Sequence, residues 1–186
     1  MMVVFHHARH EFGAAMTVTF GAMGVEIFFV ISGLVMMYST RAGKLGTART
    51  LSERRSETLL FWIKCLLRVA PLYWLALLLA AASAKNHTQI TGWTLLRDAL
   101  FISQWNKEHP QEIWPTLIAG WSLNYEMFFY FLFGLSFLLG RWGIRTICLV
   151  VCALSALGLL FNFTSAVPRF YTNPVMLHFV AGILLY

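Results

Sequence analysis

The chain has 186 residues, of which 59% are hydrophobic and only 12% are charged. Charged residues make up about a quarter of a soluble domain, so half that fraction, spread between long apolar runs, excludes a soluble protein and predicts an all-α, polytopic bundle of transmembrane helices. The net charge of +6 does not indicate nucleic-acid binding, because most basic residues lie in linkers between spans, where the positive-inside bias places them. We therefore expect a lipid bilayer as partner and no nucleic acid.

About five to six spans follow one another, and the first and last of them are incomplete. Residues 1–7 resemble the second half of a first span, and residues 176–186 the beginning of a sixth. We therefore expect a chain that is truncated at both ends, a fragment forming a single integral-membrane domain over residues 1–186. The complete spans are predicted at residues 17–38, 59–84, 117–139 and 147–163.

The connections between spans predict the orientation of the bundle. The linker at residues 41–57 is the most basic and is placed in the cytoplasm. Alternation then puts residues 85–115 outside, where a semi-apolar piece at residues 93–105 is expected to form a re-entrant or surface helix. A tight turn at residues 141–145 returns the chain inside. With this topology nine Lys and Arg residues lie inside and five outside.

Ionisable side chains within the spans are candidate functional groups, since a charge in a bilayer is costly unless it is partnered. Glu26 is the only charge in residues 17–38. At about 1.5 Å per helical residue, Glu26 lies roughly 14 Å into its span and Glu126 a similar distance into another. His7 closes the first span. We predict that these three side chains meet at one depth, where a carboxylate would orient an imidazole acting as a general base.

Arg68 is predicted to stand apart from that cluster, toward the cytoplasmic entrance of its span. A guanidinium fork there suits the phosphates of a ligand, which makes two half-sites. Simpler readings stay open. Arg68 and Lys64 can instead extend to lipid headgroups, and Glu126 with Ser122 and Tyr130 can form a structural hydrogen-bond cluster between helices.

Other patterns are assigned to structure. His6 and His10 are four apart beside Glu11, a spacing that binds metals, but one such cluster at a surface turn does not lead us to predict a metal site. Cys148 and Cys152 are interpreted as packing residues rather than as ligands or a disulfide. Three glycines are expected at close helix contacts: Gly33, Gly120 and Gly134.

Four segments together resemble the acyltransferase-3 family of integral-membrane O-acyltransferases. Residues 24–33, GVEIFFVISG, are similar to its GVDxFFVxSG signature, and residues 3–8, VVFHHA, to the end of its first span, which carries a histidine. Residues 67–74, LRVAPLYW, resemble its RIxPLYW entrance to the third span, and residues 121–130, WSLNYEMFFY, its WSLxxExxFY motif. The four occur in the family's order and cover essentially the whole chain.

The resemblance implies an enzyme that takes an acyl group, usually acetyl, from cytosolic acyl-CoA and passes it to a hydroxyl of a carbohydrate on the far side. Acyl-CoA would be a co-substrate, with no permanently bound cofactor. The exopolysaccharide- and lipopolysaccharide-modifying branch looks closest, implying a multi-pass protein of the bacterial inner membrane. The family's histidine corresponds better to His7 than to His6, because it directly precedes a small residue, here Ala8.

The other family positions map onto residues already considered. The resemblance assigns catalytic support to Glu26 and Glu126, and acyl-CoA binding to Arg68, with Lys64 replacing a second arginine of the pattern. From the motif at residues 121–130 we assign substrate binding to Trp121, Ser122 and Tyr125. Glu26 departs from the usual aspartate, Cys65 from an arginine, and the arginine that precedes the family's histidine would lie before Met1.

Three alternatives remain at this stage. A proton-coupled transporter or exporter would also place glutamate and histidine in its spans. A histidine-box metal oxidase would need more histidine clusters, whereas His87, His109 and His178 are isolated in the sequence. A non-catalytic remnant is the third alternative, because both ends look cut.

Overall fold

The computed structural model describes residues 18–42, 50–83, 90–106 and 111–186. Within these ranges the chain forms helices and connecting loops without a strand, which confirms the predicted all-α bundle. The longer helices are α2 (Val18–Ala42), α3 (Leu51–Ser83), α5 (Trp121–Leu138) and α6 (Gly143–Leu160). Three shorter ones are α4 (Gly92–Ala99), α7 (Ala166–Tyr171) and α8 (Leu177–Leu184).

Three of the described helices are long and apolar enough to cross a membrane: α2, α3 and the α6 segment that begins at Gly140. The predicted span at residues 117–139 is represented by α5, which is not among them. Its 18 residues include Asn124, Glu126 and Tyr130, whose polar side chains are buried within the bundle. The prediction for the first span, residues 1–7, lies outside the described residues.

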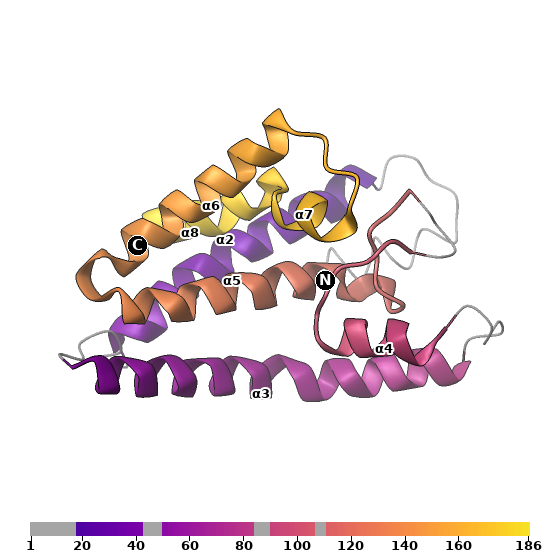
Figure 1. Ribbon diagram of the computed structural model, residues 1–186, viewed down its shortest axis with the longest axis horizontal. Coiled ribbons are helices and arrows are strands. Elements are labelled where there is room, and N and C mark those ends of the chain that lie inside the picture. Colours follow the sequence, from indigo (N-terminus) through magenta and orange to yellow (C-terminus); the bar gives the residue numbers. More distant parts are fainter. Residues whose placement is uncertain (1–17, 43–49, 84–89, 107–110) are drawn as a thin grey trace.

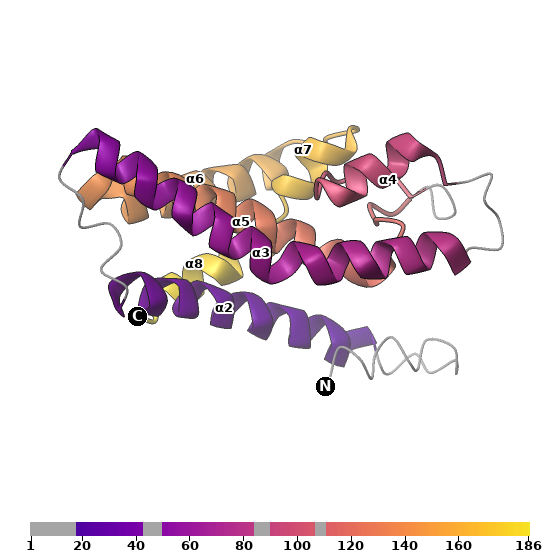
Figure 2. The ribbon, with the colours of Figure 1, turned by 90° about the horizontal axis from the view of Figure 1, so that it is seen from below.

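The long helices run alternately in two directions between two ends of the bundle (Figure 1). α2, α5 and α8 run one way, and α3 and α6 run the other. One end, which we call the basic end, carries Arg54 and Arg55 at the start of α3 and Arg141 and Arg145 at the α5–α6 turn. The opposite end, called the loop end, carries α4 and α7 (Figures 1 and 2).

Helix α3 begins eight residues before the start predicted for its span. Its first turn is capped reciprocally: the Thr50 hydroxyl accepts from the Glu53 N–H at 3.2 Å, and the Glu53 carboxylate accepts from the Thr50 N–H at 3.4 Å. This pair is a capping box, and the sequence pattern Thr-x-x-Glu was its signal. Part of the predicted basic linker is therefore helical, and Arg68 lies near the middle of α3 rather than at its entrance.

Helices α3 and α5 pack antiparallel, and side chains of α3 bond to carbonyl groups of α5. These bonds are repeated along the interface, from Arg54 to the Leu138 carbonyl at 3.4 Å, Thr58 to Gly134 at 3.2 Å, and Trp62 to Phe131 at 3.3 Å. The Trp62 indole occupies the space that a Cβ at Gly134 would need. Such bonds and small residues are the usual contacts between membrane helices, and here they set the register of α3 on α5.

Helix α2 joins the bundle mainly through α8, which runs in the same direction. A Cβ on Gly33 would overlap the Phe179 carbonyl, and a Cβ on Gly182 would overlap the Val30 carbonyl. The two backbones therefore approach closely, as predicted for Gly33. At the centre of the core the Phe179 ring stacks between Phe29, at 4.5 Å, and Phe129, at 4.3 Å between ring centroids.

The connections around α6 differ from the prediction. Gly140 has φ +60°, a left-handed conformation that glycine adopts without strain, and it turns the chain from α5 into α6. Helix α6 begins four residues before the predicted span and ends at Leu160, three residues earlier than predicted. Helix α7 was not predicted, because residues 164–174 contain two prolines and read as a loop.

The loop end is organised around the Asp98 carboxylate, which is fully buried. It accepts hydrogen bonds from the Thr116 N–H and the Gln104 amide, both at 2.8 Å. Burial raises the pKa of Asp98, whereas the hydrogen bonds from Thr116 and Gln104 act to lower that pKa. Asp98 lies in the last turn of α4, the only helical part of the predicted piece at residues 93–105, and its hydrogen bonds fix the loop that follows.

Phe101 in this loop has φ +57°, a conformation that costs a non-glycine residue on the order of 1–3 kcal/mol. Two contacts hold it: its ring stacks on Tyr73 of α3 with centroids 4.9 Å apart, and its carbonyl accepts from the Tyr171 hydroxyl of α7 at 2.8 Å. The loop is thereby bound to both α3 and α7.

The α2–α8 contact yields a stability prediction. We expect Gly182→Ala to lower the free energy of unfolding by about 1–3 kcal/mol, because the added Cβ would overlap backbone that cannot move aside cheaply. Gly92→Ala is the matched control, since a Cβ there has nothing within 4 Å. Thermal unfolding of both variants in detergent measures the difference, and equal midpoints would contradict the close backbone approach.

Candidate functional site

A buried carboxylate marks the centre of the bundle. The Glu126 side chain on α5 is 5% exposed and lies 3.6 Å from the guanidinium of Arg68 on α3, between Glu126 Oε1 and Arg68 Nη2. The Tyr130 hydroxyl bridges the two: it donates to Glu126 Oε1 and accepts from Arg68 Nη2. The Arg68 guanidinium also lies 5.3 Å from the centroid of the Tyr130 ring. A buried charge needs such partners to be tolerated.

One carboxylate of the first predicted half-site, Glu126, meets the guanidinium of the second, Arg68, in the structure. The prediction that Arg68 is separated from Glu126 along the bundle is wrong, because α3 begins early and its middle lies beside the first turns of α5. The predicted cluster of Glu126 with Tyr130 is confirmed, but the described hydrogen bonds of Glu126 do not include Ser122. Pro71, inside α3, removes a helical hydrogen bond one turn beyond Arg68, and α3 changes direction near its middle (Figure 2).

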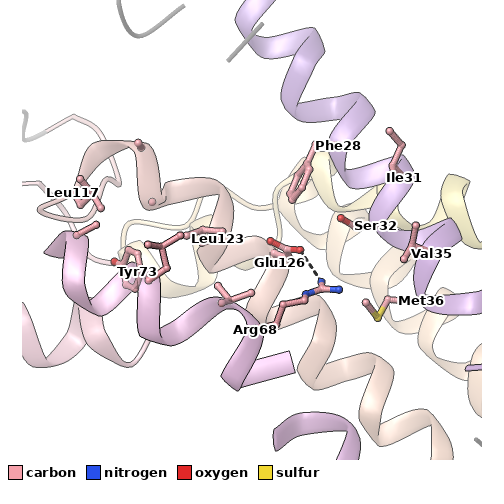
Figure 3. Close-up of a pocket in the computed structure, with 15 residues that line it drawn as sticks. Phe28, Ile31, Ser32, Val35, Met36, Arg68, Tyr73, Leu117, Leu123 and Glu126 are labelled. Carbon is pink, nitrogen blue, oxygen red and sulfur yellow. Dashed lines mark ion pairs between the residues drawn. The ribbon is translucent and has the colours of Figure 1, made fainter. Parts of the chain in front are cut away.

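A groove of about 580 Å³ opens beside this cluster, between α2, α3 and the start of α5 (Figure 3). Glu126 and Arg68 face each other across its polar part, and Ser32 of α2 lies opposite (Figure 3). Its other walls are mostly apolar: Phe28, Ile31, Val35 and Met36 from α2, Val69, Leu72, Tyr73 and Ala76 from α3, and Leu117, Ala119, Gly120 and Leu123 from the approach to α5 and its first turns. The groove thus combines an apolar channel with one charged pair.

A second cavity of about 240 Å³ continues on the other side of Arg68. It shares Arg68 and Met36 with the groove and also includes Lys64, Cys65 and Thr40. Lys64 and Thr40 lie toward the basic end, one helical turn or more from the centre of the groove along α3 and α2. Arg68 therefore borders both cavities, and Lys64 borders only the second.

Tyr73 is a groove residue that sequence reasoning did not assign to the site. Its side chain is 3% exposed, and its hydroxyl has no hydrogen-bond partner among the described residues. The Tyr73 ring lies against Gly120, where a Cβ would be 2.7 Å from it, which confirms the predicted close packing at Gly120. Residues five apart lie about 140° from each other on a regular helix, so the spacing of Arg68 and Tyr73 gave no signal that both face one cavity.

Glu26 was predicted to share a cluster with Glu126, but its described ion-pair partner is on another helix. Its carboxylate lies 3.9 Å from His178 Nε2 on α8, with side chains 47% and 35% exposed, and Glu26 does not line the groove. His178 looked isolated in the sequence. It meets Glu26 because the parallel pairing of α2 with α8 places them side by side one turn from the Val30–Gly182 contact.

The remaining predicted residues fall into two groups. Trp121, Ser122 and Tyr125 do not line the groove; Tyr125 is buried, with its ring stacked on Phe170 at 3.7 Å and edge-on to Trp121 at 5.9 Å. Their assignment to substrate binding stays a prediction. His6 and His7 lie outside the described residues, so the predicted meeting of His7 with the two carboxylates also stays a prediction. Among the described residues no three His, Cys, Asp or Glu side chains gather as a metal site would require.

Comparison with known proteins gives one family. A family model described as an acyltransferase domain matches residues 1–186. The exopolysaccharide production protein ExoZ of Rhizobium meliloti (strain 1021) is 36% identical over 185 residues, covering 96% of this chain and 54% of ExoZ. Acyltransferase MdmB of Streptomyces mycarofaciens is 31% identical over 134 residues, covering 66% of this chain and 30% of MdmB. The chain thus spans about half the length of ExoZ and a smaller share of MdmB. No solved structure matches it.

The bridging hydroxyl of Tyr130 yields a second stability prediction. We expect Tyr130→Phe to lower the free energy of unfolding by about 1–2 kcal/mol, because it removes two hydrogen bonds to charged groups and keeps the ring. Tyr38→Phe is the control, since Tyr38 is 65% exposed. Thermal unfolding in detergent compares them, and an equal shift in both would show that the hydroxyl does not hold the Glu126–Arg68 pair.

Proposed function

Since the chain belongs to the acyltransferase-3 family, we propose that it forms the groove-bearing part of a membrane O-acyltransferase. The enzyme moves an acyl group, acetyl in the simplest case, from cytosolic acyl-CoA to a hydroxyl of an exported or cell-surface carbohydrate. The carbohydrate acceptor is supported by the relative ExoZ, which is named for exopolysaccharide production. The acyl-CoA donor follows from the family resemblance of the motifs at residues 24–33 and 67–74.

The orientation that we propose for the bundle in the membrane is based on the distribution of its basic residues. The basic end carries Arg54, Arg55, Arg141 and Arg145, and the positive-inside rule places such an end in the cytoplasm. The loop end, with α4 and α7, then faces outward. A multi-pass protein of the bacterial inner membrane has this arrangement, and the three apolar helices α2, α3 and α6 support it.

The observation that carries the proposal is that two cavities meet at Arg68, next to a buried carboxylate. The smaller cavity, with Lys64, lies toward the basic end and offers two cations to the phosphates of acyl-CoA, which guanidinium and ammonium groups bind well. The groove lies on the other side of Arg68 and is apolar enough to take the acyl group. Donor and acceptor can therefore approach one site from opposite ends.

The reaction requires that a carbohydrate hydroxyl lose its proton while its oxygen attacks the thioester carbonyl. The new C–O bond forms as the C–S bond breaks, and the CoA sulfur leaves as a thiolate that takes up a proton. We assign the general base to His7, following the family resemblance. Glu126 and Arg68 support this step electrostatically. The Tyr73 hydroxyl, which lacks a partner among the described residues, is placed to bond a polar group of a substrate in the groove.

The histidine assignment is tested by two single substitutions. We expect His7→Ala to reduce acyl transfer by on the order of 10²–10⁴-fold, the usual contribution of a general base, whereas His6→Ala keeps the rate within a few-fold. Transfer of labelled acetyl from acetyl-CoA to surface polysaccharide in membrane vesicles measures both. Retained activity in His7→Ala and its loss in His6→Ala would exchange the two roles.

The groove is tested by filling it. We expect Leu123→Trp to lower acyl transfer by on the order of tenfold to a hundredfold, because the indole would displace the acyl group from its reactive position. Leu149→Trp is the matched control, on the outer face of α6 with 70% of the residue exposed. Export of polysaccharide is measured in parallel by mass spectrometry of the surface material. Loss of export with unchanged acylation in Leu123→Trp would instead indicate a transporter.

A further inference from the structure

A third pocket, which is polar, lies at the loop end, apart from the groove and the second cavity. It encloses about 220 Å³ beyond the last turn of α6 and beside α7. Its lining combines apolar and polar residues: Gly158, Phe161, Phe163 and Pro174 with Asn162, Arg169, Thr172 and Asn173. Pockets for drug-sized ligands have volumes of about 300–1,000 Å³, so this one has room for a smaller group such as one ring of a polymer.

Hydrogen-bond donors predominate among the polar side chains of the pocket. The Thr172 hydroxyl donates to the Pro168 carbonyl at 2.7 Å, and the Asn173 carbonyl oxygen accepts from the Val175 N–H at 2.9 Å, which leaves the Asn173 amide N–H groups for a ligand. Arg169 is exposed, and its described contact is with the face of Trp105, 5.5 Å from the ring centroid. Its five N–H donors remain unbonded within the described chain.

Arg169 is also the only charged residue in this lining. A pocket rich in donors with one guanidinium suits a ligand that carries a carboxylate, because arginine binds carboxylates with two parallel hydrogen bonds. Phe161 and Phe163, with ring centroids 6.2 Å apart, add apolar surface for the C–H face of a sugar ring. Asn162 supplies a donor and an acceptor for ring hydroxyls.

Contacts connect this pocket to the wall of the groove. Arg169 lies over Trp105, and Tyr171, two residues further along α7, donates to the Phe101 carbonyl in the same loop. Phe101 in turn stacks on Tyr73, which lines the groove. These contacts join the lining of the pocket to the wall of the groove, so the two belong to one packed end of the bundle.

We propose that the pocket formed by Asn162, Arg169 and Asn173 is a saccharide subsite that binds a carboxylate-bearing sugar residue, a uronate, of the acceptor polymer. The proposal rests on the proposed function, since it identifies part of the acceptor. A phosphate of a lipid headgroup has similar charge, and headgroups lie at the level where a spanning helix such as α6 ends. The binding experiment therefore includes phosphate and anionic lipid as competing probes.

Direct binding tests the subsite on the purified protein in detergent. Calorimetry is performed with methyl glucuronoside and methyl glucoside as probes. We expect the uronate to bind at least about tenfold more tightly than the neutral glycoside, and Arg169→Gln to remove that preference, as the loss of one charge-assisted contact predicts. Arg145→Gln is the matched control, because Arg145 also lies over a tryptophan, Trp142, at 5.1 Å, but at the basic end. It should bind both probes as the unmodified protein does.

The outcomes separate the subsite from the proposed function. If Arg169→Gln raises KM for the polymer and leaves kcat unchanged, both stand. If uronate binding depends on Arg169 but no acyl transfer occurs, the proposed function fails and the saccharide site remains. Equal uronate binding by Arg169→Gln and unmodified protein overturns the subsite. Binding of inorganic phosphate or of anionic lipid vesicles in place of the uronate, with the same dependence on Arg169, also overturns it and assigns the pocket to phosphate.

Discussion

The buried carboxylate of Glu126 constrains the packing of the whole bundle, because a charge that has left water is tolerated only with partners in good geometry. Its partners come from two helices: Tyr130 one turn along α5, and Arg68 from α3. Helix α3 must therefore lie on α5 in one register, and the bonds from Thr58 and Trp62 to α5 carbonyl groups agree with that register. The groove follows from this arrangement, since α3 and the start of α5 form two of its walls and α2 forms the third.

Much of the architecture follows from patterns that act over short distances. The apolar runs predict the helices, and Gly33, Gly120 and Gly134 predict close contacts because small residues allow backbones to approach. The helix boundaries were predicted less accurately. The Thr50–Glu53 cap extends α3 into a stretch of charged residues that was predicted to be a linker. The site was predicted by residue type but not by arrangement. Depth estimates place residues along one helix and do not say which helices pair, so Arg68 was set apart from Glu126, and His178 was not connected with Glu26.

The polar side chains of the bundle fall into two groups: those that hydrogen-bond to one another, and those whose donors have no partner among the described residues. Glu126 and Tyr130 are buried and bond to each other and to Arg68, whose side chain is 53% exposed and borders both cavities. Tyr73 in the groove and Arg169 at the loop end have donors without a hydrogen-bond partner among the described residues. In the proposed enzyme Glu126 and Tyr130 position Arg68, and Arg68, Tyr73 and Arg169 contact substrates. Membership of the acyltransferase-3 family is consistent with this division between support and recognition.

The parallel pairing of α2 with α8 has a consequence for biosynthesis. Helix α2 supplies one wall of the groove, yet it touches α5 only lightly and is held chiefly by the contacts of Val30 and Gly33 with Phe179 and Gly182. Those partners are translated after α2, α3, α5 and α6. The nascent bundle therefore lacks this wall until α8 inserts. A chain without α8 would pair α3 with α5 and leave Arg68 facing a groove that lacks its α2 wall.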